Sequence, residues 1–392
     1  MSAILAERLA LISQQGLYRR TIDYEPVDAA HVQKDGRIYL MLATNNYLGL
    51  THQPAVQQAA ATALAFGTGS GGSRLTTGSH LEYAALEREL AAFKGCEAAL
   101  VFNTGYMANV GAISALAGPD DMVFSDELNH ASIIDGCRLA RGRTVVYRHN
   151  DAADLAAKLA ATDCAGLRLI VTDGVFSMDG DIAPLDDIVA VAERYGAMVM
   201  VDDAHATGVI GPGGHGTAAY FGLQGRIDVQ MGTLSKSLAA EGGFIAGSQV
   251  LINYLVNTAR SFIFSTALAP ATVAAARAAL EELIVRPSLV DKLQENARFL
   301  RQALAEGGLA VSPGETPIIP VMVGEAAAAT ALAEELRSEG IIVSAIRPPT
   351  VPPGSSRLRI TVSAAHCREE LAGAAECIVR TAKRLGITGE EN

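Results

Sequence analysis

Gly232-Thr-Leu-Ser-Lys-Ser237 is the stretch of sequence that decides the fold. It follows the apolar run Ile227-Asp-Val-Gln-Met231, which is typical of a buried strand, and it precedes the glycine-rich segment Glu241-Gly-Gly243. Lys236 would therefore lie just beyond a strand end, with the Thr233 hydroxyl three residues before it. Most lysines are exposed on the surface, but this position indicates a lysine with a chemical role.

A second stretch, Val201-Asp-Asp-Ala-His205, follows the predicted strand 197–201. Asp202 is placed to pair with a protonated ring nitrogen, and His205 could reach a phenolic oxygen. A lysine that forms an imine, a hydroxyl for a phosphate and a carboxylate for a ring nitrogen are what pyridoxal 5'-phosphate (PLP) requires. Alternatively, an aspartate caps the next turn and His205 packs in the core. The two stretches together predict a PLP enzyme.

Two further segments could contact such a cofactor. Phe102-Asn-Thr-Gly-Tyr-Met-Ala-Asn109 has the pattern of a strand, a glycine turn and a helix start. The amides of Gly105 and Tyr106 would then face a phosphate, although many strand-turn-helix segments look alike. His130 could stack on the cofactor ring and donate to a substrate oxygen, although an isolated histidine is more often structural.

Arginines near both ends of the chain could bind substrate. Arg359 lies in Ser356-Arg-Leu-Arg-Ile-Thr361 and shares a strand face with Arg357. A guanidinium can bind the carboxylate of an amino acid through two hydrogen bonds. Taken alone, Arg359 fits a solvated edge strand better, and Arg19 is equally ambiguous.

Strands alternate with helices through the middle of the chain, which predicts an α/β fold with a mostly parallel sheet. The pattern includes a capping box at Ser79 for a helix that Gly95 closes. Ligands bind at the carboxyl ends of such strands, where these motifs fall. The other expected elements of this part are strands 98–102, 144–147 and 167–172 and helix 184–195.

The pattern predicts three parts: an N-terminal arm (1–50), a large domain (51–270) and a smaller α+β C-terminal domain (271–392). The arm would hold a helix that ends at Gly16 and a strand at 37–41. The C-terminal domain would contain two long helices over 270–307, strands 318–323, 341–346 and 357–362, and helices near 325–339 and at the end.

Composition excludes several classes of function. The net charge of −11 argues against general nucleic-acid binding. No apolar run is long enough for a membrane span, and Met1–Arg8 is charged too early for a signal peptide. The five cysteines show no CxxC spacing, so neither a disulfide framework nor a metal site is expected. We therefore expect a cytoplasmic protein.

Six segments together resemble the α-oxoamine synthases, a branch of the fold-type I PLP enzymes. This resemblance runs over nearly the whole chain and implies a fold-type I transferase. The segments are Thr44–Gly49, Gly67–Arg74, Asn129–Ser132, Asp173–Gly180, Asp202–His205 and Thr233–Lys236.

The resemblance implies roles for matching residues. Lys236 would form the imine, Asp202 would pair with the ring nitrogen, and His205 would contact the phenolic oxygen. Other cofactor contacts would come from His130, Ser177, Gly105, Tyr106, Thr233 and, from the second subunit of a C2 homodimer, Thr266. Arg359 and Asn45 would bind the amino acid, and Arg19 and Thr350 the acyl substrate. Asp173 stands where some members have Glu, so it is not assigned a role.

The segment Ala345-Ile-Arg-Pro-Pro-Thr-Val-Pro352, followed by Arg357-Leu-Arg-Ile-Thr361, further resembles one branch of this family. That branch condenses L-alanine with pimeloyl-CoA or pimeloyl-acyl carrier protein and releases CO2 and thiol, as in biotin biosynthesis. A sister branch, which uses glycine and acetyl-CoA, shares most cofactor motifs and remains an alternative. A catalytically silent PLP protein is a third alternative, against which the intact Lys236 and Asp202 argue.

Overall fold

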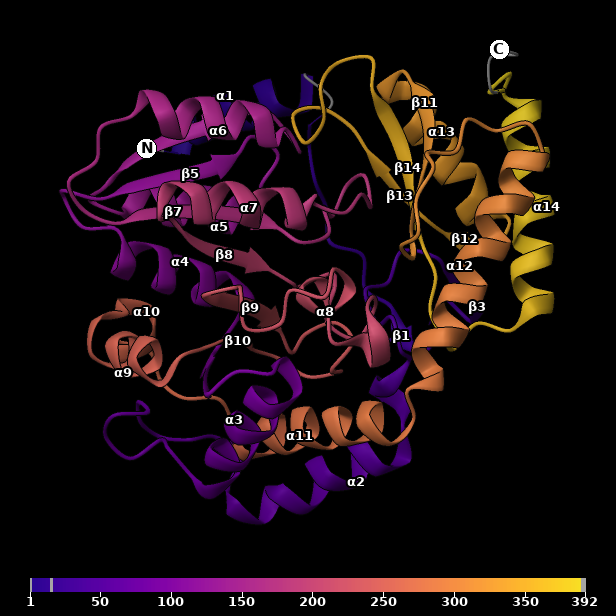
Figure 1. Ribbon diagram of the computed structural model, residues 1–392. Helices are drawn as coiled ribbons and strands as arrows, with labels where there is room; N and C mark the ends of the chain where they lie inside the picture. The colour runs from indigo at the N-terminus through magenta and orange to yellow at the C-terminus, as the bar shows by residue number, and fades with distance from the viewer. Residues whose placement is uncertain (1, 15–16, 389–392) are drawn as a thin grey trace.

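The computed structural model describes residues 2–14 and 17–388, so the predicted helix end at Gly16 lies outside the described residues. A seven-stranded sheet lies at the centre, between helices on both faces (Figure 1). Its strand order is β4-β10-β9-β8-β7-β5-β6. The strands are β4 (Ala98–Phe102), β5 (Met122–Asp126), β6 (Arg143–Tyr147), β7 (Arg168–Asp173), β8 (Met198–Asp202), β9 (Val229–Thr233) and β10 (Gly243–Gly247).

All neighbouring strands of this sheet run parallel except at β10, which is antiparallel to β4 and β9. The predicted mostly parallel sheet is therefore confirmed. Glycines begin and end β10, and the sequence analysis did not predict this strand. A side chain on Gly243 would approach the Gly105 Cα to 2.6 Å, which is why glycine fits this position. The start of β10 thus packs against the start of α4 (Gly105–Leu116).

Successive strand residues point to opposite faces of the sheet and pack against different helices. Leu169 and Val171 of β7 join a core with α4, α5 (Ala131–Leu139) and α9 (Gln249–Thr258), and Ile170 joins another with α6 (Ala152–Ala161) and α7 (Leu185–Tyr195). The other helices of this unit are α2 (Pro54–Ala63), α3 (Leu81–Lys94), α8 (Thr217–Tyr220), α10 (Arg260–Ile263) and α11 (Pro270–Val285).

The predicted capping box before α3 was wrong. His80 is the N-cap residue, and no side chain caps this helix end. Ser79 instead accepts a hydrogen bond from Arg74 Nε at 3.2 Å. The helix does end at Gly95, which has a φ of 67°.

A smaller unit contains the C-terminal part of the chain, at the right of Figure 1. Its helices are α12 (Ser288–Glu306), α13 (Ala326–Ser338) and α14 (Arg368–Arg384). One sheet has the order β11-β14-β13, and another has the order β1-β2-β3-β12. These strands are β1 (Glu25–Pro26), β2 (His31–Lys34), β3 (Arg37–Met41), β11 (Ile318–Gly324), β12 (Ile341–Ile342), β13 (Ser344–Ile346) and β14 (Ser356–Thr361).

Two expectations change in this unit. The predicted strand 341–346 is split, because β12 pairs with β3 whereas β13 pairs with β14. β14 is the central strand of its sheet, so the edge-strand alternative for Arg359 was wrong.

The N-terminal segment, which also holds α1 (Ser2–Gln14), joins the C-terminal unit through β3. Over residues 2–14 and 17–388, no helix is long and apolar enough to cross a membrane.

Candidate active site

A cavity of about 250 Å³ lies at the carboxyl ends of β8 and β9. β8 ends at Asp202, β9 ends at Thr233, and Lys236 follows three residues later. The cavity also receives the start of α4 and the residue that precedes α5. Its lining residues are Thr104, Gly105, Tyr106, Asn109, His130, Ser132, Asp173, Asp202, Ala204, His205, Met231, Thr233, Ser235 and Lys236.

Lys236 is half-buried, and its amine has no hydrogen-bond or ion-pair partner among the described residues. Burial lowers the pKa of Lys236 to about 8, although the carboxylates of Asp202 and Asp173 raise it in part. The charge of Arg359 lowers it further. An amine forms an imine only when neutral, so this environment suits a reactive lysine.

The Asp202 carboxylate is buried and held on both oxygens. Oδ2 accepts a hydrogen bond from Asn109 Nδ2 at 2.6 Å, and Oδ1 accepts one from the Ala204 amide at 2.8 Å. Asn109 also donates to Ser132 Oγ at 2.8 Å. The sequence did not single out Asn109, although it ends the quoted segment that opens α4. A polar residue on an otherwise apolar helix was the available signal.

His205 is buried beside Asp202, and its Nδ1 lies 2.7 Å from the hydroxyl of Tyr47. Burial lowers the pKa of His205 well below its ordinary value, and the charges of Lys236 and Arg359 act in the same direction. The imidazole is therefore neutral. Its Nε2 has no hydrogen-bond partner in the described part of the chain. Tyr47 belongs to a quoted family segment, but its contact with His205 joins distant parts of the sequence.

His130 is the N-cap residue of α5, and its ring orientation is fixed by the first turn. The Ser132 amide donates to Nδ1 at 3.3 Å, and Ser132 Oγ lies 2.7 Å from the same nitrogen. Burial lowers the pKa of His130, which favours a neutral ring. Because Nδ1 accepts from an amide, the proton belongs on Nε2.

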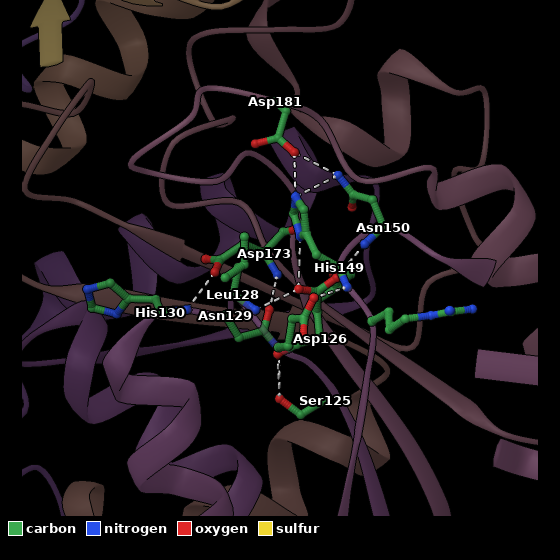
Figure 2. Close-up of polar contacts among 12 residues, drawn as sticks. Ser125, Asp126, Leu128, Asn129, His130, His149, Asn150, Asp173 and Asp181 are labelled. Carbon is green, nitrogen blue, oxygen red and sulfur yellow. Dashed lines mark hydrogen bonds and ion pairs between the residues drawn. The ribbon is translucent and has the colours of Figure 1, made fainter. Parts of the chain in front are cut away.

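Asp173, which had been left without a role, also lines this cavity. Its Oδ2 accepts a hydrogen bond from the His130 amide at 2.7 Å (Figure 2). Burial, together with the nearby charge of Asp202, raises the pKa of Asp173 well above its ordinary value. A negative charge on Asp202 therefore disfavours a second negative charge on Asp173.

The start of α4 supplies a group of hydrogen-bond donors to the same cavity. Thr104 caps the helix by accepting from the Met107 amide at 3.0 Å, and the amides of the first turn have no partner within the helix. A Cβ on Gly105 would lie 3.0 Å from Met231 Cε and 3.3 Å from Thr233 Oγ1. A crowded helix N-terminus of this kind is suited to a phosphate group.

These features fit both the pyridine ring of PLP, with its aldehyde, and the phosphate group. A free amine and two buried side chains, Asp202 and His205, lie near one another, and the helix start with Thr233 faces the same cavity. Thr233 Oγ1 donates to the Gly242 carbonyl at 2.9 Å and lies 2.7 Å from Ser235 Oγ. The residues present therefore match an aldehyde, a pyridine ring and a phosphate.

Arg359 of β14 approaches the large unit from the small one. Its Nε donates to the Ser177 carbonyl, and Nη2 donates to Asn45 Oδ1 at 3.3 Å. Ser177 thus contacts Arg359 through its backbone. Arg357, on the same strand face, pairs with Asp179 of the same loop. Asn45 and Arg359 are brought together, as the resemblance implied for an amino-acid carboxylate site.

Four predicted residues of the cofactor and acyl-substrate sites do not line the Lys236 cavity, namely Ser177, Arg19, Thr350 and Thr266. Arg19 and Thr350 line a second cavity, of about 610 Å³, which the side chains of Arg20, Arg337 and Arg347 also border. Thr266 is exposed, and its carbonyl accepts a hydrogen bond from Asn103 Nδ2 at 2.5 Å. It does not line the Lys236 cavity of its own chain.

Comparison with known proteins extends this picture. The family model "Aminotransferase class I and II" matches residues 37–378. An 8-amino-7-oxononanoate synthase of Geobacter sulfurreducens is 50% identical over 391 residues, which is 99% of this chain and 100% of the relative. Two solved structures each have a TM-score of 0.93 over 98% of both chains: a Sphingomonas wittichii serine palmitoyltransferase, at 35% identity, and SPT with a PLP internal aldimine, at 34%. The chain therefore belongs to the aminotransferase class I and II family of fold-type I PLP enzymes, and within it to the α-oxoamine synthases.

Proposed function

We propose that this chain is an 8-amino-7-oxononanoate synthase with PLP as its cofactor. The reaction joins the α-carbon of L-alanine to the thioester carbonyl of pimeloyl-CoA or pimeloyl-acyl carrier protein. The products are 8-amino-7-oxononanoate, CO2 and the free thiol. The observation that carries the proposal is the 50% identity to a synthase of that name across the whole chain, together with a cavity whose residues fit PLP.

The proposed cofactor contacts follow from the cavity. Lys236 would bind the aldehyde, Asp202 the ring nitrogen and His205 the phenolic oxygen through its free Nε2, and the start of α4 with Thr233 would hold the phosphate. When bound, PLP supplies an electron-withdrawing ring that stabilises negative charge on the α-carbon of the amino acid. Asn109 would keep the Asp202 carboxylate in place.

Arg359 and Asn45 would bind the alanine carboxylate, so that the α-hydrogen faces Lys236. The neutral Lys236 amine would remove that proton. With a pKa of about 8, an appreciable fraction of this amine is unprotonated near neutral pH. A lysine with an ordinary pKa would be protonated almost completely.

The acyl substrate would meet two parts of the site. The Nε2–H of His130 would donate a hydrogen bond to the thioester oxygen as negative charge develops there. Arg19 and Thr350 would contact the far end of the pimeloyl chain, which carries a carboxylate, in the arginine-bordered cavity. The thioester carbonyl of the acyl substrate would then lie near Lys236, and the carboxylate at the other end of the pimeloyl chain would lie near the small unit.

A C2 homodimer in the cytoplasm remains part of the proposal. Thr266 is exposed on its own chain, which suits a residue that acts in a second subunit. Apolar side chains of α1, namely Ile4, Leu5, Leu9, Leu11 and Ile12, are exposed as well and would be covered by a partner.

The resemblance to serine palmitoyltransferase gives the strongest alternative, because its TM-score is 0.93. A TM-score compares backbone paths, which the α-oxoamine synthases share, whereas identity also reflects the side chains of the substrate site. We therefore give more weight to the 50% identity with the 8-amino-7-oxononanoate synthase. The glycine and acetyl-CoA branch remains the other alternative.

Exchange of the α-hydrogen with solvent deuterium tests the first half of the reaction. The PLP-loaded protein should exchange the α-hydrogen of L-alanine, as followed by proton NMR, and should act more slowly on L-serine and glycine. Lys236→Ala should abolish exchange, whereas Lys34→Ala, at a lysine of β2 that does not line the cavity, should not. Rapid exchange by the Lys236→Ala protein would contradict the role of this lysine.

A further inference from the structure

The ring of His149 lies outside the cavity, between two carboxylates (Figure 2). Its Nδ1 is 3.0 Å from Asp126 Oδ1, and its Nε2 is 2.7 Å from Asp181 Oδ2. Burial alone would lower the pKa of His149, but hydrogen bonds to Asp126 and Asp181 raise it to about 10. Both ring nitrogens donate only in the imidazolium form, so His149 is a cation at neutral pH.

Asp126 connects His149 to the turn that carries His130. Its buried carboxylate also accepts from the Leu128 amide at 2.8 Å and the Asn150 amide at 2.9 Å. The next residue in the turn, Asn129, donates to the Val171 carbonyl and accepts from the Asp173 amide, both at 2.8 Å. His130 follows directly. The Asp126 carboxylate therefore fixes the turn from which the His130 ring enters the cavity.

Asp181 connects His149 to a different loop, residues 174–182, which follows β7. The Phe176 amide donates to the Asp181 carbonyl at 3.0 Å, and the Gly180 amide donates to the Phe176 carbonyl at 2.8 Å, so this loop is tightly folded. The same loop offers the Ser177 carbonyl to Arg359. A shift of Asp181 would therefore move a direct hydrogen-bond partner of Arg359.

We propose that His149 is a positioning residue whose ring joins the 126–130 turn to the 174–182 loop. In this role it fixes the positions of His130 and Arg359 relative to one another without touching substrate. The proposal rests on the proposed function, because Arg359 is taken to bind the amino-acid carboxylate. It predicts a defect in amino-acid binding that a purely structural histidine would not produce.

The chain contains a matched control for this test. His31 also lies between two carboxylates, with Nδ1 2.9 Å from Asp28 Oδ1 and Nε2 3.1 Å from Glu370 Oε1. The side chains of His31 and His149 are 21% and 22% exposed. His31, Asp28 and Glu370 do not line the Lys236 cavity. His31→Gln therefore removes the same kind of contact away from the site.

The experiment compares His149→Gln with His31→Gln. Each holoenzyme is assayed for its KM for L-alanine, its kcat and its thermal unfolding temperature. His149→Gln should raise the KM by about tenfold or more, because displaced substrate-binding groups lose much of their effect. His31→Gln should change the KM by no more than about twofold, as is usual for changes away from a site. Equal KM values in the wild type and in a folded His149→Gln protein would overturn the proposal.

Asp181→Asn provides a milder variant in case His149→Gln does not fold. The amide oxygen can still accept from Nε2, so we expect a smaller rise in the L-alanine KM. In this variant Asp126 still binds His149 and still fixes the turn that carries His130. The kcat should therefore change less than in His149→Gln. An unchanged KM in the Asp181→Asn protein would contradict the link between this loop and Arg359.

Histidine NMR of the wild-type protein tests the cation independently of substrate. The His149 ring should show the imidazolium pattern, with both nitrogens protonated, at pH 8, and His149→Gln should remove that signal. A neutral ring at pH 8 would overturn the proposal. A wild-type protein that shows the imidazolium but does not turn over L-alanine would instead contradict the proposed function.

Discussion

Replacing Lys236 with Met should stabilise the cofactor-free protein at neutral pH, because burying the charged amine costs free energy. Burial lowers the pKa of Lys236 from 10.5 to about 8, so the folded state binds this proton more weakly than the unfolded state does. Met retains the unbranched stem and removes the charge, so little packing should be lost.

The size and the sign of the effect follow from these two pKa values. One pKa unit corresponds to about 1.4 kcal/mol, so well below pH 8 the lysine destabilises the folded state by about 3 kcal/mol. As the pH rises from 8 towards 10.5, the unfolded state loses its advantage in binding the proton, and the penalty falls to about 1 kcal/mol near pH 9.5. The stability gained from Lys236→Met should therefore shrink with rising pH.

Urea unfolding of the cofactor-free wild type and the Lys236→Met protein measures this difference. Both proteins should be compared at equal concentration at pH 7 and pH 9.5, since any oligomer would make stability depend on concentration. Lys34→Met provides the control at a lysine whose side chain is 40% exposed and should change little. A Lys236→Met protein that is less stable than the wild type at pH 7, or whose advantage does not depend on pH, would refute the reasoning.

Three further substitutions test other parts of the account. Arg359→Lys removes the planar guanidinium and should weaken L-alanine binding by about 2 kcal/mol, measured as KM; an unchanged KM would place the carboxylate site elsewhere. Lys94→Met leaves the buried Asp203 carboxylate without its 2.7 Å ion pair and should cost about 3–5 kcal/mol in urea unfolding; an unchanged stability would contradict the importance of this ion pair. Gly105→Ala should weaken PLP binding by about tenfold, or about 1.4 kcal/mol, measured by cofactor titration, whereas Gly373→Ala, with open space around it, should not.

The sequence predicted the residues that follow strand ends, because apolar runs and the polar residues after them are local patterns. Asp202, His205 and Lys236 line one cavity at the carboxyl ends of β8 and β9, where the pattern expected a ligand. His130 lines it as well. Their chemical roles remain predictions until the variants are measured.

The sequence could not predict features that depend on long-range packing. The contact between Tyr47 and His205 and that between Asn109 and Asp202 depend on how distant elements meet. Strand β10 was not predicted, and its first residue is Gly243 because the start of the strand packs against the start of α4. The 341–346 run is apolar except for Ser344, and its division between two sheets follows from its partners β3 and β14.

Product formation tests the central claim most directly. The purified PLP-loaded protein would be supplied with L-alanine, L-serine and glycine together, first with pimeloyl-CoA or pimeloyl-acyl carrier protein, and then with palmitoyl-CoA or acetyl-CoA. Mass spectrometry would identify the products. The account predicts 8-amino-7-oxononanoate from L-alanine and a pimeloyl thioester, with release of CO2 and thiol. A product from L-serine and palmitoyl-CoA or from glycine and acetyl-CoA, with none from the pimeloyl thioesters, would contradict it.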